Sequence, residues 1–149
     1  MPENFEKLQC WQACFALKNY LREQVLISLP KTERFELYSQ ILRASRSATA
    51  NIAEGWGRFH YKENIKFLLN SRGSVAEILD HSIEAKTWDY ISDEVLQEIR
   101  TQTDSCIRLI NGYIKYLRKQ NDQEKWVLKR NKNQSTINQS PFTNPQLTN

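Results

Sequence analysis

Apolar residues recur every three or four positions along most of this 149-residue chain, and this spacing is the feature that most restricts its fold. The clearest example is a run of steps of four, three, four and four residues, which keeps one face of an α-helix apolar: Leu37, Ile41, Ala44, Ala48 and Ile52. A chain with 4 Gly and 4 Pro has few residues that would interrupt such a helix. The pattern therefore predicts long amphipathic helices rather than many short strands.

Four segments with this spacing predict four helices, at about residues 4–29, 31–55, 60–88 and 93–120. Pro30 is expected to end the first helix, because the residue before a proline is displaced from the α region. Ser92 is a good N-cap for the fourth helix, and the acidic Asp93 and Glu94 would then lie at the positive end of its dipole. Gly73 interrupts the third apolar stripe, so a kink or the close approach of a facing helix is expected there.

These helices imply an all-α fold, because each one must bury its apolar face to be stable in water. Their short connections favour an antiparallel up-down four-helix bundle over residues 4–120. Residues 121–132 are predicted to be a basic helical extension or a frayed helix end. Residues 133–149 are rich in Asn, Gln, Ser, Thr and Pro, and too few apolar side chains are present to offset the cost of ordering, which predicts a disordered polar tail.

Residues 51–58, Asn-Ile-Ala-Glu-Gly-Trp-Gly-Arg, predict the corner between the second and third helices. Gly55 and Gly57 are expected to adopt positive φ there, because glycine has no Cβ to penalise it. Asn51 and Glu54 are expected to hydrogen-bond the backbone or neighbouring helices. The corner also brings aromatic and basic side chains to one exposed end, which suits nucleic acid or a protein interface: Trp56, Arg58, Phe59, His60, Tyr61 and Lys62.

Charge is unevenly distributed over the chain, which carries 21 Lys and Arg against 17 Asp and Glu. Residues 38–72 and 115–132 have an excess of positive charge, and residues 77–104 an excess of negative charge. Such segregation can steer an anionic partner to one surface, or it can pair opposite faces of neighbouring subunits. The candidate nucleic-acid-binding residues are Arg43, Arg46, Arg58, Lys62, Lys66, Arg118 and Lys119.

Known catalytic motifs are absent from the sequence, which has no glycine-rich phosphate loop, serine elbow or His/Cys cluster with metal spacing. We therefore expect no catalytic residue, cofactor or metal. The three cysteines, Cys10, Cys14 and Cys106, are interpreted as small packing residues. No apolar run reaches the roughly 20 residues that a membrane span needs, and the N-terminus lacks a signal-peptide pattern, so a cytoplasmic location is expected.

The chain resembles the four-helix bundle proteins encoded within intervening sequences of bacterial large-subunit ribosomal RNA genes. The resemblance covers about residues 5–117 and is most specific at the corner. Supporting elements are Phe5-x-x-Leu8-x-x-Trp11-Gln12, Ser-Gln-Ile-Leu-Arg-Ala at 39–44, Phe67-Leu68 and Arg-Gly-Ser-x-x-Glu at 72–77. Family members commonly carry a proline shortly before the corner, whereas this chain has Ser-Ala-Thr-Ala at 47–50, so the resemblance does not carry over a proline kink.

The resemblance implies a bundle that assembles as a homopentamer and has no established catalysis. A related branch comprises accessory variability proteins of diversity-generating retroelements, which bind a reverse transcriptase and nucleic acid through a basic surface. Two hypotheses follow. The first is an oligomeric nucleic-acid-binding accessory protein, which could serve a retroelement reverse transcriptase. The second is a protein-protein scaffold of the same family without nucleic-acid binding.

Overall fold

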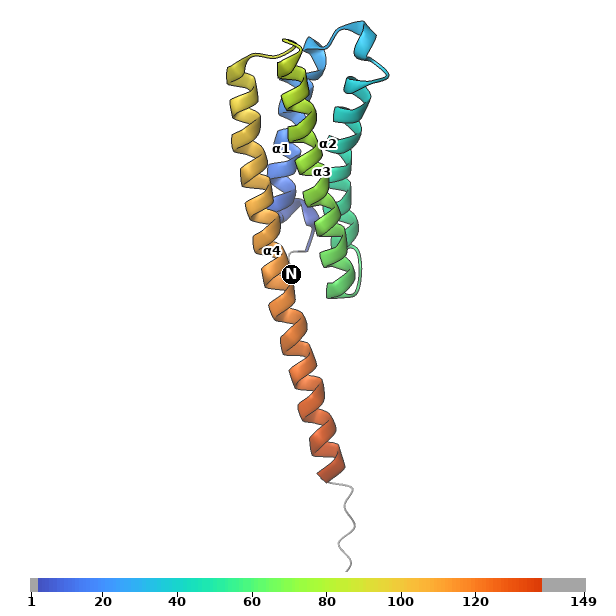
Figure 1. Cartoon of the computed structure of the whole chain (residues 1–149). Coiled ribbons are helices and arrows are strands. Elements are labelled where there is room, and N and C mark those ends of the chain that lie inside the picture. The colour runs from blue at the N-terminus through green and yellow to red at the C-terminus, as the bar shows by residue number, and fades with distance from the viewer. Residues whose placement is uncertain (1–2, 138–149) are drawn as a thin grey trace, which may run out of the picture.

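The computed structural model describes residues 3–137, and over that range it contains four α-helices and no strand (Figure 1). The α-helices are α1 (Gln9–Gln24), α2 (Leu37–Trp56), α3 (Tyr61–Thr87) and α4 (Asp93–Ile137). Three 3-10 helices precede or connect them: η1 (Phe5–Lys7), η2 (Leu26–Ser28) and η3 (Lys31–Glu33). Figure 1 shows the four α-helices side by side in an up-down bundle, with α4 continuing far beyond the other three. The predicted all-α four-helix fold is confirmed.

The core is built from the apolar stripes that predicted the helices. Every helix contributes fully buried aliphatic side chains, including Leu17 and Leu21 of α1, Ile41 and Ile52 of α2, Leu68 and Ile78 of α3, and Ile99, Ile110 and Leu117 of α4. Each such side chain contributes about 1.5–3 kcal/mol when it is removed from water. This burial holds together helices whose connections are short.

The ends of the first two helices differ from the prediction. The continuous helix expected over residues 4–29 is broken at Leu8, whose ψ of 124° is extended, and again at Val25. Leaving the helix lets the Leu8 side chain reach the core. The second α-helix begins at Leu37 rather than at residue 31 or 32, because Glu33 ends a 3-10 turn and its carboxylate accepts the Leu37 N–H at 3.2 Å.

The starts of the last two α-helices agree with the prediction. Tyr61 begins α3, and Ser92 caps α4 by accepting the Val95 N–H on its hydroxyl oxygen at 3.2 Å. Small residues bring α2 and α3 close together. The Ser71 hydroxyl donates to the Ala48 carbonyl at 2.7 Å, and the Ser74 hydroxyl lies 2.8 Å from the Ser47 hydroxyl.

Gly73 has a different environment from the one predicted. The facing helix expected there is not found, because a Cβ added at Gly73 would have no atom within 4 Å among the described residues. The α3 helix continues unbroken through this position. The close approach expected at Gly73 is made instead by the neighbouring Ser71 and Ser74, which face α2.

The last helix is longer than predicted. The helical extension expected over residues 121–132 is present, and α4 continues to Ile137, so residues 133–137 are helical rather than part of the tail. Residues 113–137 contain no Gly or Pro, and a helix already nucleated in the bundle gains one hydrogen bond for each residue it adds. The rest of the predicted tail, residues 138–149, lies outside the described residues.

Candidate nucleic-acid interface

The corner between α2 and α3 turns without a left-handed glycine. Gly57 has a φ of −72°, and no glycine among the described residues has positive φ, so the positive φ predicted for Gly55 and Gly57 is wrong. The Gly57 N–H donates to the Ala53 carbonyl and the Arg58 N–H to the Gly55 carbonyl, each at 3.1 Å. His60 is then extended, with a ψ of 134°, which directs the chain into α3.

Gly55 is required for packing rather than for backbone freedom. A Cβ added at Gly55 would lie 2.8 Å from the Asn64 Oδ1 and 3.0 Å from both the Asn64 carbonyl oxygen and the Phe67 Cβ. Asn64 is itself buried at the start of α3. The missing side chain therefore lets the first turns of α3 pack directly against the end of α2.

Of the other two predicted corner residues, Asn51 bonds the backbone as expected, whereas Glu54 pairs with a side chain instead. The Asn51 amide donates to the Ser47 carbonyl and hydroxyl oxygens, each at 2.9 Å, and so remains within α2. The Glu54 carboxylate pairs with Arg58 across one helical turn, with 2.5 Å between Oε1 and Nη2. The Arg58 guanidinium also lies over the Phe67 ring, 5.0 Å from its centroid. Both charged residues remain accessible to solvent.

The aromatic residues of the corner divide into two groups. Trp56 turns inward, packs against the core and has its ring centroid 6.0 Å from that of Phe5. It is therefore a packing residue, not the exposed aromatic that the sequence predicted. Phe59 is 93% exposed and remains available to a partner.

A hydrogen bond and the lining of a cavity show which parts of α3 and α4 lie opposite each other. Arg72 donates from Nη1 to the Asn111 Oδ1 at 2.9 Å, and residues 59–62 line a cavity of about 320 Å³ with Asn121 and Glu124. Lys62 lines that cavity, Lys66 lies one helical turn farther along α3, and Arg118 lies about one turn before Asn121 on α4. All three side chains are exposed. We call Lys62, Lys66 and Arg118 the basic seam.

The remaining predicted residues lie elsewhere. Lys119 lines a cavity on the opposite side of α4 with Lys115 and Trp126. Arg43 and Arg46 are exposed on α2, and Arg46 is ten residues before the end of that helix, or about 15 Å along its axis. The structure therefore brings Arg58 and the basic seam to one end of the bundle but leaves Arg43 and Arg46 away from it.

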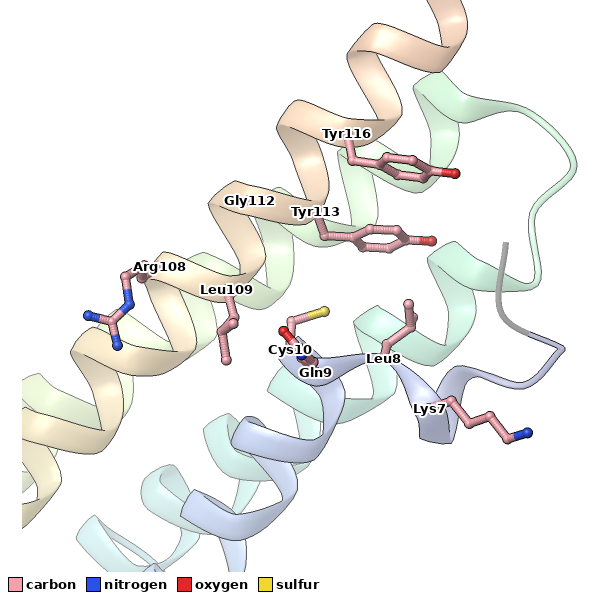
Figure 2. Close-up of a pocket in the computed structure, with 9 residues that line it drawn as sticks. All are labelled: Lys7, Leu8, Gln9, Cys10, Arg108, Leu109, Gly112, Tyr113 and Tyr116. Atoms are coloured by element: carbon pink, nitrogen blue, oxygen red, sulfur yellow. The ribbon is translucent and has the colours of Figure 1, made fainter.

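Sequence reasoning missed a groove between the start of α1 and the middle of α4 (Figure 2). One cavity of about 420 Å³ is lined by Lys7, Leu8, Gln9, Cys10, Arg108, Leu109, Gly112, Tyr113 and Tyr116. Figure 2 shows the two phenol rings projecting in the same direction from α4, above Leu8 and Cys10. The rings are stacked, with centroids 6.1 Å apart and 13° between their planes. A helical projection of α4 alone would have placed Arg108, Gly112 and Lys115 on this face.

The cysteines are all free and buried in the core, as the packing interpretation predicted. Burial raises the pKa of the Cys10 thiol to about 11, which keeps it neutral at ordinary pH. No cluster of three or more His, Cys, Asp or Glu that could hold a metal ion occurs among residues 3–137. None of the helices in that range is both long and apolar enough to span a bilayer.

The family described as 23S rRNA-intervening sequence protein has a model that matches residues 6–112 of the chain. The comparison with curated proteins found no match to the chain. The matched region contains α1, α2, the corner, α3 and the first part of α4. Residues 113–137, which include Arg118, Lys119 and Trp126, lie outside the matched region.

Proposed function

Because the chain belongs to the 23S rRNA-intervening sequence protein family, we propose that it is a non-catalytic, oligomeric protein that binds nucleic acid. The observation that supports this most directly is the gathering of cations at one end of the bundle. Arg58, Lys62 and Lys66 are exposed there, and Arg118 is exposed on α4 about one turn before Asn121, which lines the cavity at this end with Lys62. The long exposed end of α4 adds further Lys and Arg residues to the same end.

Such a surface contacts the phosphates of a nucleic acid and does not recognise its base sequence. Each cation that neutralises a phosphate releases counterions, so affinity falls as salt rises, and the contact carries no sequence information. The nearby acids that form ion pairs make them locally: Glu54 with Arg58, and Asp122 with Lys125, with 4.0 Å between Oδ1 and Nζ. Phe59 would supply an exposed ring beside the phosphates.

Self-association is part of the proposal. Leu69, Gly73, Ala76 and Ile83 are all exposed on α3, and their spacing of four, three and seven residues places them on one face. A small and apolar stripe of this kind suits the packing of another helix. The resemblance to the intervening-sequence proteins supports five copies, which would repeat the basic end and raise avidity.

The finer role we propose is that of an accessory subunit for a retroelement reverse transcriptase. It is supported by the resemblance to the accessory variability proteins of diversity-generating retroelements. A reverse transcriptase gene with a mutated template repeat beside the gene for this chain, and copurification of the two proteins, would support that role. Location of the gene inside a ribosomal RNA gene, without such an enzyme, would count against it.

The alternative is a scaffold in which segregated charge pairs subunits with one another. A further cavity, of about 350 Å³, favours the scaffold alternative, because it is lined by four glutamates and His81. The glutamates are Glu33, Glu36, Glu77 and Glu84. The cavity lies between α3 and the start of α2, toward the end opposite the corner. Basic and acidic ends of different copies could therefore meet.

Binding of RNA and DNA oligonucleotides to the full chain, measured by fluorescence anisotropy over a salt series, tests the main proposal. Removing the basic seam with Lys62→Gln, Lys66→Gln and Arg118→Gln should weaken binding and reduce the slope of log K against log salt by about 2–3. The matched control is Arg43→Gln with Arg46→Gln, which removes exposed cations from α2 and should change the slope less.

Absence of binding at low salt would refute the nucleic-acid proposal. If removal of the basic seam instead lowers the mass of the assembly in solution, the scaffold reading gains, because the same cations then pair subunits.

A further inference from the structure

We propose that the groove beside α4 binds single-stranded nucleic acid by stacking unpaired bases on Tyr116 and Trp126. The inference rests on the proposed nucleic-acid function and adds the type of strand and its site. It is separate from the basic seam, which lies on the α3 side of α4. Most of the groove also lies beyond the region that the family model matches, in residues 113–137.

The groove is continuous because two cavities share part of their lining. The cavity of about 420 Å³ at the start of α1 and a second one of about 850 Å³ farther along α4 are both lined by Gly112 and Tyr116. We call the shared feature the α4 groove and define it by six residues of α4: Arg108, Gly112, Lys115, Tyr116, Lys119 and Trp126.

Two aromatic rings in the groove remain available for stacking. Tyr116 is 41% exposed and is backed on one side by Tyr113, against which it stacks. Trp126 is 60% exposed, and the Arg130 guanidinium lies 5.3 Å from its ring centroid. Ten residues separate the two rings in sequence, or about 15 Å along the helix axis. Aromatic rings along a cationic surface are the usual platform for unpaired bases, and at this spacing the two rings would hold bases that are not adjacent in the strand.

The charge of the groove fits a polyanion. Four cations line the two cavities, Lys7, Arg108, Lys115 and Lys119, and none of them makes an ion pair within the described part of the chain. Asp122 is the one acid in the lining, and it already pairs with Lys125. Bases that stack on Tyr116 and Trp126 would therefore have cations within reach of their phosphates.

Stacking distinguishes a single strand from a duplex. Both faces of a paired base are covered by its neighbours in a helix, so it cannot lie flat on a tyrosine or tryptophan ring, whereas an unpaired base can. The groove's rings would add affinity for single strands. The basic seam, which reads only phosphates, would accept either form.

Gly112 offers a way to close the groove. A Cβ at this position has no atom within 4 Å among the described residues, and Gly112 lines both cavities, so Gly112→Leu would add a bulky side chain to the lining that the two cavities share. Ala50 provides a control, because it is also a small exposed residue within a helix and it lines neither cavity.

The experiment measures binding of the full chain to labelled single-stranded DNA, single-stranded RNA and a DNA duplex of equal length. Tyr116→Ala and Trp126→Ala should each weaken binding of both single strands by about 5-fold to about 150-fold, the range known for the loss of one stacked base. Gly112→Leu should weaken it within the same range, and Ala50→Leu should leave it unchanged. Duplex binding should change much less in all four variants.

Wild-type affinity for single strands in Tyr116→Ala, Trp126→Ala and Gly112→Leu would overturn the inference. If removal of the basic seam still weakened binding in that case, the proposed function would stand without the groove. If the unmodified chain bound neither single strands nor duplex at low salt, the proposed function itself would fail. A lower assembly mass in Gly112→Leu, but not in Ala50→Leu, would show that a second copy fills the groove and would also overturn the inference.

Discussion

The α2–α3 pair and the free end of α4 are both regular helix, but they are stabilised in different ways. Where α2 meets α3, small residues remove side-chain volume and hydroxyls bond across the interface, as Ser71 does to the Ala48 carbonyl. Beyond Leu117, α4 has no buried residue among those whose exposure is described. The side chains of the first region are restricted by tertiary contacts with a neighbouring helix, whereas those of the second region are exposed or only partly buried. Aromatic and cationic side chains that the fold does not need are thus concentrated in the second region.

The largest effect on stability should come from filling the closest contact of the α2–α3 pair. Gly55→Val would place a side chain against Asn64 and Phe67 and should lower the free energy of unfolding by about 3 kcal/mol. Urea denaturation would measure this. Gly57→Ala is the control, because its Cβ would lie no closer than 3.5 Å to the atoms around it and should cost little. Equal losses in both variants would show that the corner needs glycine for another reason.

A smaller effect of opposite sign is expected at the exposed glycine of α3. Gly73→Ala should raise the free energy of unfolding by roughly 1 kcal/mol, because alanine is the better helix former and its methyl group meets open space. The same denaturation experiment measures the gain, with the mass in solution checked in parallel. Destabilisation together with a lower assembly mass would mean that another copy packs so closely at Gly73 that a methyl group does not fit.

The smallest effect on stability should come from removing the free end of α4. Truncation after Asn121 deletes exposed residues, so the free energy of unfolding should change by no more than about 0.5 kcal/mol. The same truncation removes Trp126 and several cations, and it should weaken binding of single-stranded nucleic acid. A loss of several kcal/mol would show that this segment is structural, for example as part of a subunit interface.

Much of the tightly packed region could be predicted from the sequence. The apolar spacing located all four helices, and Ser92 located the start of α4. The reason for Gly55 could not be predicted, because it depends on Asn64, which faces it from another helix. The break at Leu8 likewise depends on a core that the local sequence does not describe.

The candidate site was less accessible to prediction. Charge counting identified Lys62, Lys66 and Arg118, which lie within about one helical turn of residues that line the cavity between α3 and α4. It also selected Arg43 and Arg46, which lie apart, because a count of charge along the chain carries no information about distance between helices. The groove was missed because Lys7 and Arg108 come close only when α1 packs against α4.

Ultraviolet crosslinking tests the central claim most directly, because it locates the contact on the chain. A single-stranded oligonucleotide carrying bromouracil would be irradiated with the full chain at low salt, and the crosslinked peptides identified by mass spectrometry. The account predicts crosslinks within residues 58–66 and 108–130, with Tyr116 and Trp126 among them. Crosslinks confined to α2 around Arg43 and Arg46 or to the acidic residues 77–104, or no crosslinks at all, would contradict it.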